Sequence, residues 1–545
     1  MAEGARPLTP RPFPDPDRAW KLGGGLAAAL AVWLFLGLPF AALLTQAAEG
    51  DPTLLATDAY LRGVVLFTLE QAALSALLSV AGAVPLALAL HRTRFPGRGL
   101  VLRLFLLPQA LPVLVGALGI LALWGRAGLV SEGLAALGLP RLDIYGLPGI
   151  LLAHVFFNLP LATRLLYARL DAVPAESWRL AGQLALPAAT TFRLIEMPAL
   201  REGLAGAASL TFMICVTSFT LVLVLGGGPG ATTLEVEIYQ ALRTDFDPGR
   251  AVILALAQIV LTGLFLLVAT RLGPRLDAAF TLGRPARRFD RRGRALRLLD
   301  AAAIALGLAF VLSPFVVVVL RGLGADLLRL LGEAAVRDAL LTSAAIGFAA
   351  SCLALVFTLS LLFAREAWRG SGRVGGTAID LSASLVLVVP PIVTGAGWFL
   401  LLRRWTDAFA LAPILVVTTN AVMAMPFLLR LLGPPLTEAL ARHRRLADHL
   451  GLRGWSRLRH VEGPALAGPL ALGFALALSL SLGDLGVVAL FGNENFVTLP
   501  YLLYQRMGSY RTMDASGLAL ILGTASLVLV ALAEGFALSR TRNRR

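Results

Sequence analysis

The sequence has little charge, one lysine and two cysteines. Charged residues make up 15% of its 545 residues and hydrophobic residues 57%, whereas soluble domains carry roughly 25% charge. Together with a mean hydropathy of +0.77, this excludes a soluble enzyme as the default class and predicts a membrane protein. Cys215 and Cys352 both lie within apolar runs, which predicts core packing and excludes a disulfide framework or a zinc site.

Motifs for catalysis and nucleotide binding are missing as well. The sequence contains no G-x-x-x-x-G-K-[ST] segment, so the chain is not expected to bind ATP, and energy for any transport must come from a partner or a gradient. It also lacks clustered metal ligands and a Ser/His/Asp constellation. The GGGPG segment at 226–230 is interpreted as a turn that closes the fifth apolar run. We therefore expect a protein that is not an enzyme.

Twelve apolar runs are long enough, at 1.5 Å per residue, to cross a hydrocarbon core of roughly 30 Å. The predicted fold class is therefore an all-α polytopic membrane protein with twelve transmembrane helices. The first run is expected to span the membrane rather than to be a cleaved signal. The predicted spans are 22–46, 64–90, 101–124, 147–166, 203–225 and 251–270, followed by 301–320, 339–364, 381–402, 408–429, 468–491 and 515–533.

Arginine is concentrated in connections that fall on one side of the membrane when the runs alternate in direction. The net charge of +15 is thus interpreted as an orientation signal rather than as a nucleic-acid surface. We expect both termini to be cytoplasmic at a bacterial inner membrane, with Glu235 and Glu237 among the acidic residues of the opposite side. Arg403 and Arg404 break the rule.

The chain contains an internal sequence duplication. Ile195-Glu196-Met197-Pro198 recurs as Val461-Glu462-Gly463-Pro464, with 464 − 198 = 266. Downstream, Thr233-Leu234 recurs as Thr498-Leu499, with 498 − 233 = 265. We therefore predict two homologous six-span halves. The expected domains are a tail at 1–21, a first half at 22–270, a basic linker at 271–300, a second half at 301–538 and a basic tail at 539–545.

The duplicated segments, 176–198 and 442–464, resemble the EAA loop of binding-protein-dependent ABC importer permeases. The matching or diverging positions are Glu176, Arg179, Ala181, Ala185, Ile195 and Pro198 in the first copy, and Arg445, Ala447, Gly451, Val461 and Pro464 in the second. The family's Glu falls on Arg179 and Arg445, and its Gly falls on Ala185 in the first copy. The residue patterns suit a short helix that begins after Pro174, and a second over 442–452.

The flanking segments 150–160, 225–242, 483–493 and 499–511 are similar to those of the fused permeases of bacterial thiamine and thiamine pyrophosphate importers. This resemblance implies that the two loops dock on two copies of an ABC ATPase, which would hold ATP and Mg, while this chain binds no cofactor. It also implies a periplasmic binding protein that delivers a small-molecule substrate, a lipid surrounding, and no nucleic-acid partner.

Ionisable and polar groups within the predicted spans are candidates for the translocation path, because such groups are costly in a membrane. A negative path would favour a thiazolium cation, with Phe156, Phe157 or Phe219 available for cation–π contact. The alternative interpretation is that each polar group simply pairs with a neighbouring helix, and for His154 we favour such a contact. The candidates are Glu70, His154, Asn158, Asp484 and Ser218, the last being the counterpart of Asp484 in the repeat.

Other functions remain open at this stage. A ferric-iron importer permease shares the duplicated layout, and polyamine or anion permeases are more distant alternatives. A gradient-driven secondary transporter, often built from repeats, would work without an ATPase. A membrane scaffold would not transport at all.

Overall fold

The computed structural model describes residues 17–47, 57–272, 293–368, 382, 385–386, 388–403, 405–509 and 511–542. Helices dominate this part of the chain, and its only strand-like feature is an isolated bridge between Asn493 and Phe496. Eleven helical segments are long and apolar enough to cross a membrane, and Pro391–Leu402 adds a shorter apolar helix. The predicted all-α polytopic fold is confirmed. Most of the expected linker and of the first tail falls outside the described residues, whereas the last helix, Thr512–Arg542, extends into the expected second tail.

The first half contains six spans and several shorter helices. Its spans are α1 (Arg18–Ala47), α3 (Ala59–Arg92), α6 (Val113–Trp124), α8 (Leu147–Asp171), α11 (Met197–Val216) and α14 (Pro248–Leu272). The shorter elements are α4 (Arg98–Leu104), α5 (Leu107–Ala110), α7 (Leu129–Ala136), α9 (Ala175–Gln183), α10 (Ala188–Thr191), a π-helical turn (Phe192–Glu196), α12 (Thr220–Leu225), a 3₁₀ turn (Pro229–Ala231) and α13 (Leu234–Arg243).

The second half repeats this order. Its spans are α15 (Arg294–Leu323), α17 (Ala334–Trp368), α19 (Pro391–Leu402), α20 (Ala412–His449), α22 (Gly463–Leu482) and α25 (Thr512–Arg542). The shorter elements are α16 (Leu327–Gly332), α21 (Gly454–Arg457), a π-helical turn (Leu458–Glu462), α23 (Gly486–Phe491) and α24 (Leu499–Gly508). The two π-helical turns occupy equivalent places before α11 and α22.

Two predicted spans in each half differ from the single helices expected. The run at 101–124 is divided into α4, α5 and α6, and α6 begins after Pro112, whose ring fixes φ and lacks an N–H donor. In the same way α19 begins after Pro390. The runs at 203–225 and 468–491 are each interrupted, at 217–219 and at 483–485. The prediction of uninterrupted helices there is wrong, and the breaks expose backbone inside the bundle.

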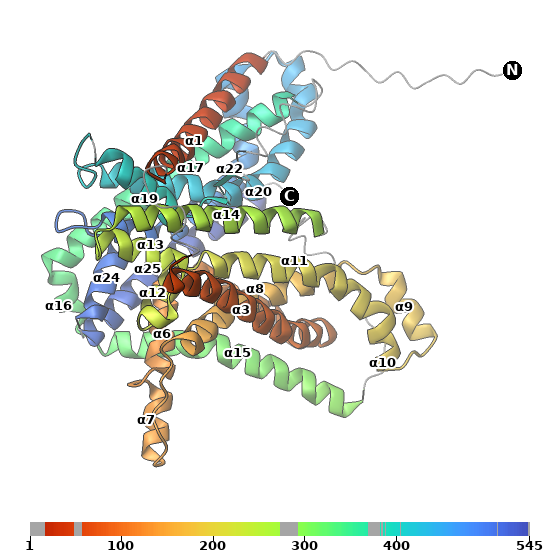
Figure 1. The fold of residues 1–545 in the computed structure, drawn as a ribbon. Coiled ribbons are helices and arrows are strands. Elements are labelled where there is room, and N and C mark those ends of the chain that lie inside the picture. The colour runs from red at the N-terminus through yellow and green to blue at the C-terminus, as the bar shows by residue number, and fades with distance from the viewer. Residues whose placement is uncertain are drawn as a thin grey trace.

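The first helix of each half packs on the opposite half. Figure 1 shows α1 beside α17 and α15 beside α3. Glycine allows close approach in both places, because a Cβ on Gly25 would lie 2.1 Å from Ala364 Cβ, and one on Gly307 would lie 2.9 Å from Leu86. The first helix of each half thus packs against the other half and helps to hold the two halves together.

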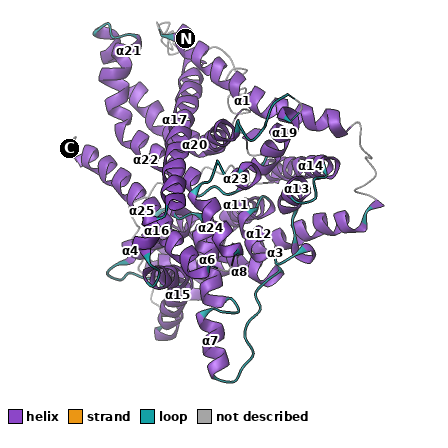
Figure 2. Ribbon diagram, turned by 90° about the vertical axis from the view of Figure 1, so that its left-hand side faces the viewer, coloured by secondary structure: helices purple, strands orange, loops and turns teal. Residues whose placement is uncertain are grey.

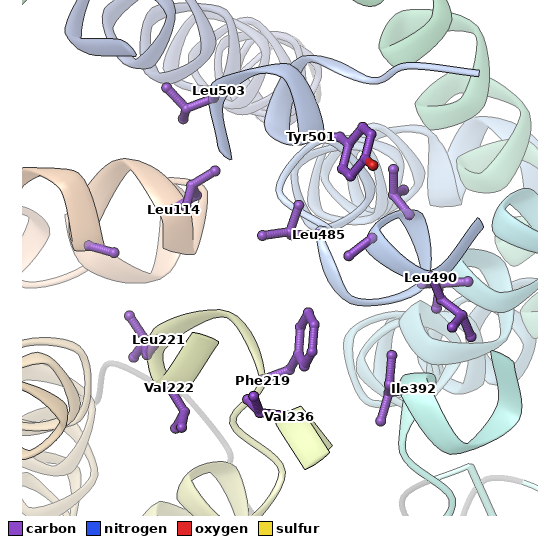
Figure 3. Close-up of a cluster of buried hydrophobic side chains, with 14 of the residues drawn as sticks. Leu114, Phe219, Leu221, Val222, Val236, Ile392, Leu485, Leu490, Tyr501 and Leu503 are labelled. Atoms are coloured by element: carbon purple, nitrogen blue, oxygen red, sulfur yellow. The ribbon is translucent and has the colours of Figure 1, made fainter. Parts of the chain in front are cut away.

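A shared apolar core joins the two halves near the points where the helices are interrupted, after α11 and after α22. Figure 3 shows Phe219 surrounded by side chains of both halves. Polar contacts add to this junction, since Ser479 Oγ donates to the carbonyl of Ala110 at 3.0 Å. Cys215 is buried, as expected, but Cys352 on α17 is exposed, so its predicted core position is wrong.

Candidate functional site

Loop 1 (residues 176–198) contains the short helix α9, which follows Pro174 as predicted. The helix is ended by Ala185, whose backbone has a φ of +46°. Leu186 then donates its backbone N–H to the carbonyl of Ala181 at 3.0 Å, which closes the turn. Left-handed backbone is unfavourable for a residue with a Cβ, so loop 1 holds a strained alanine at this position.

Loop 2 (residues 442–464) makes the same turn with a glycine. Gly451 has a φ of +63°, and Leu452 donates to the carbonyl of Ala447 at 3.0 Å. The helix that precedes it differs from the one expected, because 442–449 forms the end of α20, which runs unbroken from Ala412. The predicted separate helix over 442–452 is therefore wrong.

Both loops present leucines on either side of a buried alanine. Ala181 and Ala447 are buried at equivalent positions. The leucine one residue before and the leucine three residues after each of them are more than half exposed: Leu180 at 55%, Leu184 at 61%, Leu446 at 57% and Leu450 at 63%. Two matched apolar surfaces of this kind are typical of partner contacts.

The other predicted loop residues differ in exposure. Glu176, Arg179 and Pro198 are exposed, and Ile195, Val461 and Pro464 are half-buried. The side chain of Arg445 lies outside the described residues.

Loop 1 is fastened to the end of α3. The buried carboxylate of Glu196 forms a bidentate ion pair with Arg92, with 2.8 Å between Arg92 Nε and Glu196 Oε1. Arg92 also lies 3.9 Å from Asp300 of α15. The ring of Trp178 packs on His91, with 5.3 Å between ring centroids. The anchor of loop 1 is therefore a neighbouring span.

Loop 2 is fastened by a pair within the loop and by the start of α1, where the buried Lys21 lies close enough to attract the carboxylate of Glu462. Its equivalent buried Glu462 pairs with Arg457, which belongs to the same loop, at 3.0 Å. Arg457 also lies 3.6 Å from Asp448 at the end of α20. The backbone N–H of Gly454 donates to Asp17 Oδ1 at 2.7 Å, which ties the loop to the start of α1.

Both loops lie on one face of the bundle. Loop 2 contacts the start of α1 through Asp17, and Figure 2 shows α21 at the same end of the bundle as the start of α1. Loop 1 contacts the end of α3 through Arg92. Because α1 and α3 are successive spans, the start of the first and the end of the second are on the same side.

A cavity of about 360 Å³ lies between the halves at the breaks in the spans. The first half lines it with the connection between α5 and α6, with α8, with the break between α11 and α12, and with α13. The second half contributes the start of α19 and the break between α22 and α23. This volume falls within the range of small-molecule sites.

The structure brings together four of the five residues predicted for the path. His154, Asn158, Ser218 and Asp484 all line the cavity. Glu70 does not line it and is exposed on α3.

His154 is fully engaged within the helix bundle. Its Nδ1 lies 2.9 Å from Ser75 Oγ, and its Nε2 lies 2.9 Å from Ser218 Oγ. Asn158 lies one turn further along α8 and donates to Cys215 Sγ at 3.3 Å. These contacts hold α8 against α3 and against the break after α11, and they agree with the helix–helix contact that we favoured for His154.

Sequence reasoning missed Glu235 as a cavity residue. It was assigned to an outer connection, but α13 folds inward and leaves this side chain 1% exposed in the cavity wall. A signal was available, because the repeat places Pro500 at the equivalent position, with 500 − 235 = 265.

The chain matches a family model described as "Binding-protein-dependent transport system inner membrane component" over residues 81–278 and again over 356–540. The match covers most of the chain and occurs once in each half. This protein therefore belongs to that family, the membrane-spanning permeases of ABC importers. The resemblance proposed from the two loops is confirmed, and the chain is a transport component rather than a scaffold or a secondary transporter.

Relatives that align with this chain over almost their whole length share one name. The chain is 51% identical over 521 residues to the thiamine transport system permease protein ThiP of Brucella abortus (strain 2308), covering 95% of this chain and 96% of the relative. It is 44% identical to the protein of that name from Salmonella typhimurium, with 98% of each chain covered. It is 43% identical to that of Escherichia coli (strain K12), with 96% of each covered.

Proposed function

We propose that this chain is the membrane-spanning subunit of an ATP-driven importer for thiamine or its phosphate esters. The observation that carries this proposal is its identity to thiamine permeases along almost the whole of both chains. In this arrangement a periplasmic binding protein delivers the substrate, both termini are cytoplasmic, and the chain lies in a bacterial inner membrane. A ferric-iron permease is the alternative with the same layout.

Two ATPase subunits dock on loops 1 and 2 in this proposal. The support is the pair of exposed leucine surfaces on one face, each carried by a turn of the same geometry. The ATPases would hold ATP and Mg, because the chain lacks a phosphate-binding loop. The ion pairs at Glu196 and Glu462 would pass movement of each docked ATPase to α11 and α22, since each π-helical turn leads directly into one of these helices.

The substrate passes through the cavity between the halves in this proposal. The support is its position between the two halves, beside the interruptions after α11 and after α22, and its polar lining, which includes His154, Asn158, Ser218 and Asp484. Unwound backbone at membrane depth is tolerated where it lines a cavity of this kind.

A docking experiment tests the assignment of the loops. Leu180→Asp with Leu184→Asp, and separately Leu446→Asp with Leu450→Asp, should each reduce ATPase co-purification by about tenfold or more, because charge replaces a buried apolar contact. Leu137→Asp is the matched control, since Leu137 is exposed on the C-terminal side of α7 and outside both loops. Unchanged co-purification of both double variants would contradict the docking assignment.

Uptake in proteoliposomes tests the substrate. The complete system, with its ATPase and binding protein, should accumulate thiamine only when ATP is present inside. Accumulation of ferric iron in place of thiamine would favour the alternative.

A further inference from the structure

Buried glutamates in the described part of the chain fall into two groups. Three of them contact an arginine, and the fourth, Glu235, contacts neither an arginine nor a lysine. Its hydrogen-bond partner is the amide of Gln258, at 3.3 Å. Removing a carboxylate from water without a cationic partner is strongly unfavourable. The three ion pairs are Glu196 with Arg92, Glu237 with Arg250 and Glu462 with Arg457.

Asp484 is a second carboxylate of this kind. Its Oδ1 accepts the backbone N–H of Gly486 at 3.1 Å, and the Asn420 side chain and the Val487 backbone also lie beside the carboxylate. Its buried Oδ2 forms no hydrogen bond of normal length among the described residues. It forms no ion pair in that part of the chain. Asp484 and Glu235 line the same cavity, and the described lining includes no arginine or lysine. The chain as a whole has 48 basic and 33 acidic residues. The charged side chains in the described cavity lining are acidic instead.

Each half supplies one of these acids, and the repeat makes the asymmetry visible. Asp484 has Ser218 as its counterpart, and Glu235 has Pro500. The equivalent positions of the repeat therefore adopt the same local structure without an acidic residue. A scaffold that forms the same break with a serine, and starts the same helix with a proline, has no structural need for the acids.

An aromatic ring lies beside one of the carboxylates. A Cβ placed on Gly486 would lie 3.6 Å from Asp484 Oδ1 and 3.7 Å from Phe219 Cδ1. The carboxylate and the ring edge therefore approach a common point at the cavity wall. Figure 3 shows Phe219 pointing from the first half toward Leu485, the residue after Asp484. Carboxylate and aromatic groups together are suited to organic cations.

We propose that Asp484 and Glu235 form a binding site for an organic cation within the cavity, and that the charge of the transported substrate replaces the missing arginine. This rests on the proposed function, because thiamine carries a permanent thiazolium charge. The site holds the substrate after the binding protein has released it, and it distinguishes cations from neutral molecules of similar shape.

The proposal predicts opposite effects on stability and on binding. Asp484→Asn and Glu235→Gln keep the shape of each side chain and remove an unpaired buried charge. The melting temperature of the empty complex should therefore stay unchanged or rise, whereas a purely structural role would lower it. Thiamine binding should weaken by about tenfold or more in each variant, as for the loss of a charge-assisted contact.

The experiment uses the purified complex of this chain and its ATPase in lipid nanodiscs, without the binding protein. Equilibrium binding of radiolabelled thiamine is measured beside that of thiochrome, its neutral tricyclic oxidation product. Wild type should prefer thiamine, and each acid variant should lose that preference. Gly486→Ala should also weaken thiamine binding, because its methyl group occupies the space between Asp484 and Phe219. Glu132→Gln on α7 is the control, since Glu132 is exposed and away from the cavity.

Two results would overturn the proposal. One is saturable thiamine binding that is equal in wild type and both acid variants. The other is the absence of binding to the wild-type complex at millimolar thiamine. Uptake measurements separate this failure from that of the proposed function: if ATP-driven thiamine uptake is intact in wild type and unchanged in the variants, the cation site is rejected and the importer stands.

Discussion

The two loops share a backbone plan but differ in what holds them. Each places a buried alanine, a left-handed residue and a π-helical turn at equivalent positions. In loop 1 the buried glutamate is held by Arg92 of α3, a separate span. In loop 2 the equivalent glutamate pairs with Arg457 of the same loop, and Lys21 of α1 lies close enough to attract it as well. The two loops therefore share their backbone shape, but different residues hold the buried glutamate in each.

This difference has a mechanical consequence. A movement of loop 1 must also move α3 or break the pair with Arg92, whereas loop 2 carries its own Arg457 with it and acts on the start of α1 through Asp17 and Lys21. We therefore expect loop 1 to transmit motion to α3 and loop 2 to transmit it to α1.

Breaking the Arg92 anchor should have the largest effect. Arg92→Gln leaves the buried carboxylate of Glu196 without its cation, and removal of one partner of a buried pair costs about 3 to 5 kcal/mol. Loop 1 should then exchange its backbone hydrogens much faster, as measured by hydrogen exchange with mass spectrometry, while loop 2 is unchanged.

The double variant Arg92→Gln with Glu196→Gln is the control for this anchor. It removes both charges and should recover most of the protection, because Glu196 is then neutral and no longer requires a cation. Equal exchange in loop 1 of the single and double variants would contradict an electrostatic anchor.

Removing Asp17 should have a smaller effect, confined to loop 2. Its carboxylate accepts from the backbone of Gly454, and a hydrogen bond to a charged group contributes about 1.5 to 3 kcal/mol. Asp17→Ala should accelerate exchange at 453–457 and leave loop 1 protected. Faster exchange of equal size in both loops would indicate general loosening of α1 instead.

The membrane spans could be predicted from sequence because length and hydropathy determine which segments cross a bilayer. The breaks could not, since Thr217 and Ser218 interrupt the fifth run too little to lower its hydropathy. Pro112 was a usable signal for the third run. Proline does not always mark such a break, because α20 continues through Pro434 and Pro435.

The cavity and the helix exchange depend on packing that hydropathy does not contain. From sequence, Glu235 is predicted to lie in an outer connection, whereas in the structure α13 packs against the core and buries it. The exchange of α1 and α15 is likewise invisible, since an apolar helix has the same pattern whether it faces lipid or either half. The loops were located by their repeat, whereas the leucines beside Ala181 and Ala447 were recognisable as exposed only in the structure.

Exchanging the left-handed residues of the two loops should have the smallest effect and act with opposite signs. Ala185→Gly removes a Cβ from a backbone with a φ of +46°, and Gly451→Ala adds one at +63°. A Cβ in this conformation costs about 1 to 2 kcal/mol, so the first variant should slow hydrogen exchange in loop 1 and the second should accelerate it in loop 2. Open space surrounds Gly451, with nothing within 4 Å of an added Cβ, so backbone strain alone is being measured. Changes of the same sign in both loops would show that the two turns are not equivalent.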